Sequence, residues 1–70
     1  MYRIAATNSS RATRYGEPET DTEPAALDKA RDMSAEFGGV SFGVFEIRPG
    51  EGAFLVASYL NGERRFTAAS

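Results

Sequence analysis

The chain has 70 residues, with 10 acidic and 8 basic side chains and a formal charge of −2 at pH 7. It contains no Cys, His or Trp, and Leu, Ile, Val and Phe together supply only 13 residues. We therefore expect one small domain over residues 1–70, with few large apolar groups to stabilise it. Disulfides are excluded, and zinc, copper and iron sites lose their usual ligands, so no metal or other cofactor is expected. No apolar run approaches the ~20 residues of a membrane span and no signal peptide is expected, so the interpretation is a cytoplasmic protein without a membrane partner.

The first third of the chain predicts one strand followed by polar connecting residues. Residues 2–7 alternate roughly between apolar and polar side chains, which favours an opening strand. Residues 8–10, Asn-Ser-Ser, are typical of a turn. Residues 11–15 either return as an edge strand, giving an extra hairpin near the N-terminus, or stay in a loop. Residues 16–22 are expected to be a polar spacer.

A single helix is predicted over residues 24–37. Thr22 or Glu23 can cap it, and Pro24 suits its first turn. Residues spaced three and four apart form one apolar stripe: Ala26, Leu27, Ala30, Met33, Ser34 and Phe37. Gly38-Gly39 ends the helix, because glycine accepts the left-handed conformation that closes a final turn.

The rest of the chain predicts an antiparallel meander of three strands, over residues 40–48, 53–60 and 63–67. The first two are joined by a turn at residues 49–52. Asn61-Gly62 indicates a two-residue type I′ hairpin between the last two. The predicted fold class is α+β in the order β-α-β-β-β, with one helix packed on a short antiparallel sheet.

The apolar residues of this meander do not all share one face. A single helix can cover only one face of the sheet, yet Phe42 and Val44 have one parity while Phe45 and Ile47 have the other. A β-bulge near Gly43 could bring most of them onto the helix side. Otherwise the sheet is apolar on both faces, and the uncovered face needs a target or a second copy, which makes a homodimer an expected state.

The sequence favours binding over catalysis. Without His or Cys, acid–base chemistry would fall to carboxylates, tyrosines or the single lysine, Lys29. The carboxylates lie mostly in polar segments, where nothing raises their pKa towards neutrality. The Gly38-Gly39 pair follows a helix, whereas a phosphate-binding glycine loop precedes one. We therefore do not expect an enzyme.

Charged residues allow two further interpretations. Arg11 and Arg14, Lys29 and Arg31, and Arg64 and Arg65 could form a local basic patch for nucleic acid, although the net charge is negative and a solvated surface explains them as well. Acidic residues also occupy four alternate positions: Glu17, Glu19, Asp21 and Glu23. In an extended segment this row could imitate a phosphate backbone. It could equally provide solubility and favourable charge at the helix start.

The order of elements from the helix onwards resembles that of a known group. Residues 26–31 lead into a glycine-bearing strand at 39–47, then a strand at 52–59, and then the Asn-Gly turn with its basic-aromatic ending, Arg64-Arg65-Phe66. Over residues 25–66 this resembles the small phage-encoded anti-CRISPR proteins that inhibit type I CRISPR-Cas systems. The resemblance rests on element order and turn placement.

This resemblance implies a non-enzymatic inhibitor in the cytoplasm of a host bacterium. It would bind a subunit of a type I CRISPR surveillance complex and block target-DNA binding or nuclease recruitment. A small nucleic-acid-binding accessory protein and a dimeric structural module are the alternatives. No contact residue is carried over from the group. The partner-binding residues that this sequence itself suggests are Lys29, Arg31, Tyr59, Arg64 and Arg65, since arginine makes bidentate contacts with carboxylates and phosphates.

Overall fold

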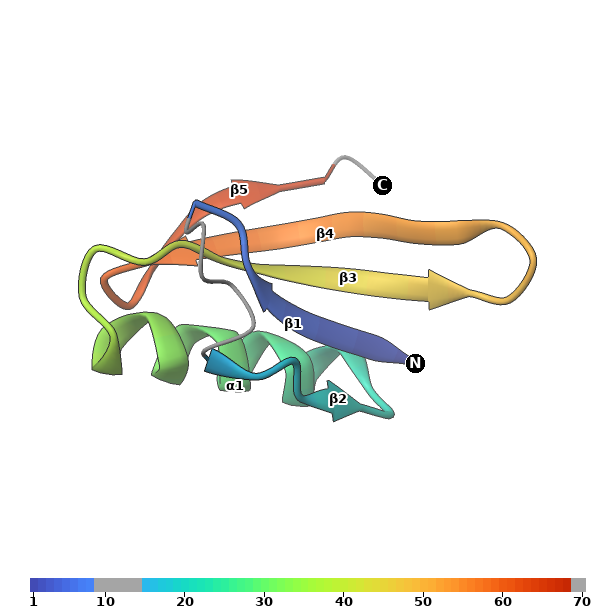
Figure 1. The fold of residues 1–70 in the computed structure, drawn as a ribbon, viewed down its shortest axis with the longest axis horizontal. Coiled ribbons are helices and arrows are strands. Elements are labelled where there is room, and N and C mark those ends of the chain that lie inside the picture. The colour runs from blue at the N-terminus through green and yellow to red at the C-terminus, as the bar shows by residue number, and fades with distance from the viewer. Residues whose placement is uncertain (9–14, 69–70) are drawn as a thin grey trace.

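The computed structural model describes residues 1–8 and 15–68 as a five-stranded antiparallel sheet with one helix on one face (Figure 1). The elements are β1 (Tyr2–Ala6), β2 (Glu19–Thr20), α1 (Glu23–Glu36), β3 (Phe42–Arg48), β4 (Gly52–Leu60) and β5 (Glu63–Thr67). The strands lie in the order β2-β1-β3-β4-β5, so β2 and β5 are the two edges. The predicted α+β class, with its single helix and its meander, is confirmed.

Helix α1 begins and ends one residue earlier than predicted. The Thr22 side chain accepts a hydrogen bond from the backbone N–H of Ala25 at 3.4 Å, which satisfies one of the free donors of the first turn. At the other end, the N–H of Phe37 still donates to the carbonyl of Met33. Of the two glycines that follow, Gly39 takes the left-handed conformation, at φ +82°.

Strand β2 lies inside the segment that the sequence suggested to be only a polar spacer, and that prediction was wrong. Glu19 and Thr20 pair with Arg3 and Tyr2 of β1, and the N–H of Ile4 donates to the carbonyl of Pro18 at 3.0 Å. The alternative edge strand at 11–15 lies outside the described residues, apart from its last residue.

The β3–β4–β5 meander follows the predicted turns closely. Strand β3 begins two residues later than predicted, at Phe42, and β4 begins one residue earlier, at Gly52. Asn61 and Gly62 have φ values of +53° and +80°, which confirms the predicted hairpin, since a type I′ turn needs positive φ at both positions.

The core lies between α1 and one face of the sheet. Its buried apolar residues are Ile4, Ala6, Phe42, Val44, Ala57 and Tyr59 from the strands and Ala26, Ala30 and Met33 from the helix. Leu27 and Phe37 of the predicted stripe are only half-buried, whereas Ser34 is fully buried. The ring of Tyr15 packs on Phe37 and Phe42 at centroid distances of 5.0 and 5.7 Å, which closes the core beside β1.

Two irregularities interrupt the strand pairing. Val44 lies opposite Ala57 and Phe45 lies opposite Leu55, so Val56 of β4 has no partner in β3. A bulge therefore exists close to the predicted position, but its extra residue belongs to β4. A second shift, between Ser58 and Tyr59, leaves Arg65 of β5 without a partner.

Candidate functional site: the open face and the arginine edge

The face of the sheet opposite α1 is apolar, and we call it the open face. Alternation along β3 places Phe45 and Ile47 on the side opposite buried Phe42 and Val44. Residues opposite one another in neighbouring strands share a face, which adds Leu55 and Ala53 of β4 opposite these two, and Phe66 of β5 opposite Ser58. The bulge does not bring most apolar residues onto the helix side, so the sheet is apolar on both faces.

In the part of the chain that the structure describes, some side chains of the open face are exposed to solvent. Leu55 and Phe66 are 38% and 45% exposed, and Phe45 and Ile47 are half-buried. Large exposed apolar side chains grouped on one side of a small protein are typical of an interaction surface.

Gly43 lies on the open face near the start of β3, and its lack of a side chain determines the local packing. A Cβ at this position would meet Leu55 Cδ1 and Phe45 Cε2 at 3.0 Å and Thr7 Cγ2 at 2.9 Å. These three side chains therefore lean together over Gly43. The result is a continuous apolar layer across β3 and β4, where a larger residue would push the side chains apart.

The predicted partner-binding residues do not form one cluster, because they lie in the core, on strand β5 and on two flanks of α1. Tyr59 is 5% exposed and belongs to the core, so a partner can reach little of it. Its hydroxyl accepts two hydrogen bonds from Arg64, from Nε at 3.0 Å and from a terminal nitrogen at 2.7 Å. Tyr59 therefore positions Arg64. Arg65 follows in the same edge strand, with 56% of its side chain exposed.

Arg31 and Lys29 lie on opposite flanks of α1. The carbonyl of Arg31 accepts a hydrogen bond from Ser34 Oγ, which in turn accepts one from the N–H of Gly62, so this flank adjoins the β4–β5 hairpin. The Arg31 guanidinium is paired with Asp28 at 3.4 Å and with Asp32 at 3.7 Å. Arg31 thus lies on the flank of α1 that adjoins the hairpin, with its guanidinium paired to the helix's own aspartates, and Lys29 lies on the other flank.

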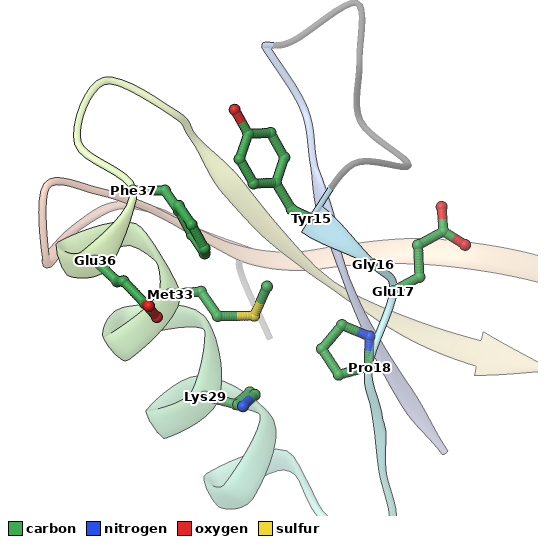
Figure 2. Close-up of a pocket in the computed structure, with 8 residues that line it drawn as sticks. All are labelled: Tyr15, Gly16, Glu17, Pro18, Lys29, Met33, Glu36 and Phe37. Carbon is green, nitrogen blue, oxygen red and sulfur yellow. The ribbon is translucent and has the colours of Figure 1, made fainter.

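Lys29 lines a shallow groove on the other flank of α1, with a volume of about 470 Å³ (Figure 2). One wall consists of Lys29, Met33 and Glu36 of α1 and Phe37, the residue that follows the helix. The other wall is the segment Tyr15, Gly16, Glu17 and Pro18. Figure 2 shows the aromatic rings at one end and the charged side chains along the rim. Sequence reasoning missed this groove, because only the tertiary contact of residues 15–18 with α1 creates it.

The predicted row of four carboxylates is not one uniform array. Glu19 pairs with Arg3 at 3.2 Å on the edge of the sheet, and Glu17 lies in the groove wall. Glu23 is the first residue of α1, where its charge complements the helix dipole. Glu19 and Glu23 therefore have local roles, and mimicry of a phosphate backbone stays a prediction.

A polar cluster lies where β1, β3 and β4 meet beyond the buried core. The Arg48 Nε donates a hydrogen bond to Glu46, and the Arg48 guanidinium lies 4.3 Å from the ring centre of Phe54. The Tyr2 hydroxyl donates to the same carboxylate at 3.4 Å. The hydrogen bond from Arg48 lowers the pKa of Glu46, whereas partial burial and then the charge of Glu46 raise the pKa of Tyr2.

Among residues 1–8 and 15–68, no group of three or more His, Cys, Asp or Glu side chains could hold a metal ion. In the same residues, no helix has the length and apolar character needed to cross a membrane. No protein-family model matches the chain, and comparison with curated proteins and with solved structures finds no significant similarity.

Proposed function

We propose that this protein acts by binding, and that the open face of its sheet docks on a type I CRISPR surveillance complex. In this proposal the bound protein blocks target-DNA binding or nuclease recruitment in the cytoplasm of the host bacterium. The observation that carries the proposal is the apolar open face, which α1 leaves uncovered. The resemblance of residues 25–66 to small type I anti-CRISPR proteins supplies the identity of the target.

The open face has the properties that a docking surface requires. Burial of apolar area contributes about 25 cal/mol per Å² to the free energy of binding, before the costs of association. Leu55 and Phe66 are the most exposed apolar side chains of the open face, so their burial would contribute most. They lie on neighbouring strands of a hydrogen-bonded sheet, so a partner would meet a rigid surface. Arg65 lies on the edge strand β5, next to Phe66, and could supply a charged contact at the rim of this face.

A direct test measures binding of the purified protein to type I surveillance complexes, followed by target-DNA binding by those complexes. We expect Leu55→Ser and Phe66→Ser each to weaken binding at least tenfold. Phe54→Ser is the matched control, because Phe54 is similarly exposed at 41% but lies opposite Glu46 on the helix side of the sheet. No association with complexes of several subtypes would contradict the proposal.

A second copy of the chain is the alternative occupant of the open face. Light scattering over a range of concentrations distinguishes the two occupants. A dimer that Leu55→Ser dissociates and Phe54→Ser does not would show that the open face serves self-association, and docking of a target on it would then be wrong.

A nucleic-acid-binding accessory role is favoured by one observation, the exposed arginines of β5. Phosphate binding releases counterions and weakens steeply as salt rises. An electrophoretic shift that disappears between low and moderate salt, and that needs Arg64 and Arg65, would favour this role over the inhibitor.

A further inference from the structure

Strand β5 is an edge strand whose outer side has no neighbour in the described sheet. It is last in the strand order, and all five of its residues, Glu63–Thr67, are exposed. An edge strand presents unpaired N–H and C=O groups, which can bind another extended segment by strand addition. At five residues, β5 is more than twice as long as β2, the other edge.

The base of β5 is held firmly against α1. The N–H of Gly62 donates to Ser34 Oγ at 2.9 Å, and the N–H of Gly39 donates to Asn61 Oδ1 at 2.9 Å. Gly62 also approaches Ala35 closely, since a Cβ on Gly62 would meet the Cβ of Ala35 at 3.3 Å. A strand fixed in this way loses little further freedom when a partner pairs with it.

Arg64 is oriented in advance but keeps unused donors. An arginine side chain carries five N–H donors, and the Tyr59 hydroxyl accepts two of them. Within the part of the chain that the structure describes, no carboxylate pairs with Arg64. The remaining donors are therefore suited to a carboxylate supplied from outside, in the bidentate geometry that guanidinium groups favour.

Arg65 adds a second positive charge beside the first. Its contact with Glu63, at 3.5 Å between side chains that are 56% and 73% exposed, is a surface pair worth about 0–1 kcal/mol. An incoming carboxylate can compete for it. A second β5 strand is a poorer partner, because antiparallel registers centred on Arg64 or Arg65 set arginines of the two copies opposite one another, and like charges across a strand pair are destabilising.

From these features we infer that β5 binds an extended acidic segment of a partner protein by strand addition, with Arg64 and Arg65 pairing with its carboxylates. Backbone hydrogen bonds would supply part of the affinity, and the arginines would select the charge of the segment. A peptide is favoured over a nucleic acid because the edge offers backbone groups that only another peptide chain can pair in register. This inference concerns the sheet edge, so it stands independently of any docking on the open face.

The test uses the full chain, labelled with ¹⁵N, and a capped eight-residue peptide in which glutamate alternates with valine. We expect chemical-shift changes and slower amide exchange confined mainly to β5 and its hairpin. Arg64→Gln with Arg65→Gln should weaken binding at least tenfold. The matched control, Arg3→Gln with Arg48→Gln, removes the same charge elsewhere and should change binding less than twofold. Because Arg64 also bonds Tyr59, Arg65→Gln alone serves as a second variant and should weaken binding about threefold.

Two comparisons can overturn the inference. Two peptides of the same charge, one N-methylated at an internal valine and the other at the adjacent glutamate, each lose one backbone donor, and the two donors point to opposite sides of the strand. One of the two should therefore bind at least tenfold more weakly than the parent peptide; binding equal to the parent by both would exclude strand addition. A ten-nucleotide single strand of thymidines that bound the same arginines more tightly than the peptide would show that the edge recognises nucleic acid. Shift changes restricted to the open face, or no binding at millimolar peptide, would also contradict it.

Discussion

One buried hydroxyl, that of Ser34, joins the helix to the last hairpin. Ser34 is fully buried, and its Oγ donates to the carbonyl of Arg31 and accepts from the N–H of Gly62, both at 2.9 Å. A small polar residue on an apolar stripe is thus explained by a tertiary hydrogen bond. The sequence places Ser34 in the stripe, but its partner is 28 residues away and has no signal in the local pattern.

Replacing Ser34 tests this link. Ser34→Ala leaves the Gly62 N–H without its acceptor, which we expect to cost about 1–3 kcal/mol of the free energy of unfolding. Urea denaturation followed by circular dichroism measures the change. Ser58→Ala is the control, since Ser58 is only half-buried, and its effect should stay within about 0.5 kcal/mol. Equal stability of Ser34→Ala and the wild type would show that the hydroxyl is dispensable.

The burial of Tyr59 is a feature of the candidate site that could not be predicted from the sequence. A tyrosine next to a hairpin is a reasonable contact residue, and a periodic strand also predicts that alternate residues are buried. Which alternate set is buried depends on the bulge at Val56, which no glycine or proline marks. Once the register is known, Tyr59 lies opposite Phe42 in the core. Of the three contact residues predicted on this hairpin, Arg64 and Arg65 are exposed.

At the scale of single elements, the Asn61-Gly62 turn was predictable in full because its chemistry is local. Gly62 has a φ of +80°, which costs a residue with a side chain about 1–2 kcal/mol. We expect Gly62→Ala to destabilise the protein by at least this amount, since its Cβ would also press on Ala35. The control is Gly38→Ala, where φ is not positive and the new Cβ would be in ordinary contact at 3.6 Å. Similar melting temperatures for the two variants would contradict this account.

Helix α1 was predictable to within one residue, because its cap, its stripe and its terminal glycines are all encoded locally. Strand β2 was not predictable, because Glu19 and Thr20 show no apolar alternation and become a strand only by pairing with β1. The open face was left undecided for the same reason. Parity along β3 and β4 indicated two apolar faces or a bulge, and the structure contains both.

The pair of Glu46 and Arg48, near the end of the β3–β4 hairpin, predicts how the stability of the protein changes at acidic pH. The hydrogen bond from Arg48 lowers the pKa of Glu46 in the folded protein. The ionised Glu46 side chain therefore stabilises the folded protein. This stabilisation is complete above the ordinary pKa of glutamate and is lost as pH falls through the lower pKa of Glu46 in the folded state. Glu46→Gln removes it, so the stability of wild type and variant should converge as pH falls below the ordinary pKa of glutamate. Urea midpoints at a series of pH values measure this. A gap between them that stays constant over the range would exclude the ion pair as its cause.

At the scale of the whole molecule, the chain divides its large apolar residues between the two faces of the sheet. The helix side holds the buried core around Ile4, Phe42 and Val44. The open face holds Phe45, Ile47 and Leu55, and the side chains of Phe45 and Leu55 meet over Gly43. Helix α1 lies on the other face and does not cover them (Figure 1). A chain of this size is expected to have a small free energy of unfolding. The proposed role of the open face in binding therefore predicts that its residues add less to folding than those of the core.

A matched pair of substitutions separates the two surfaces. Ile4→Ala and Leu55→Ala remove the same number of carbon atoms, from a side chain that is 0% exposed and from one that is 38% exposed. We expect Ile4→Ala to cost about 2–5 kcal/mol of the free energy of unfolding, because it leaves a cavity in the core. Leu55→Ala should cost less than about 1 kcal/mol, because its neighbours can relax into solvent. Urea denaturation of both variants at low protein concentration measures the difference. Comparable losses would mean that the open face belongs to the folding core, and its assignment as a docking surface would then fail.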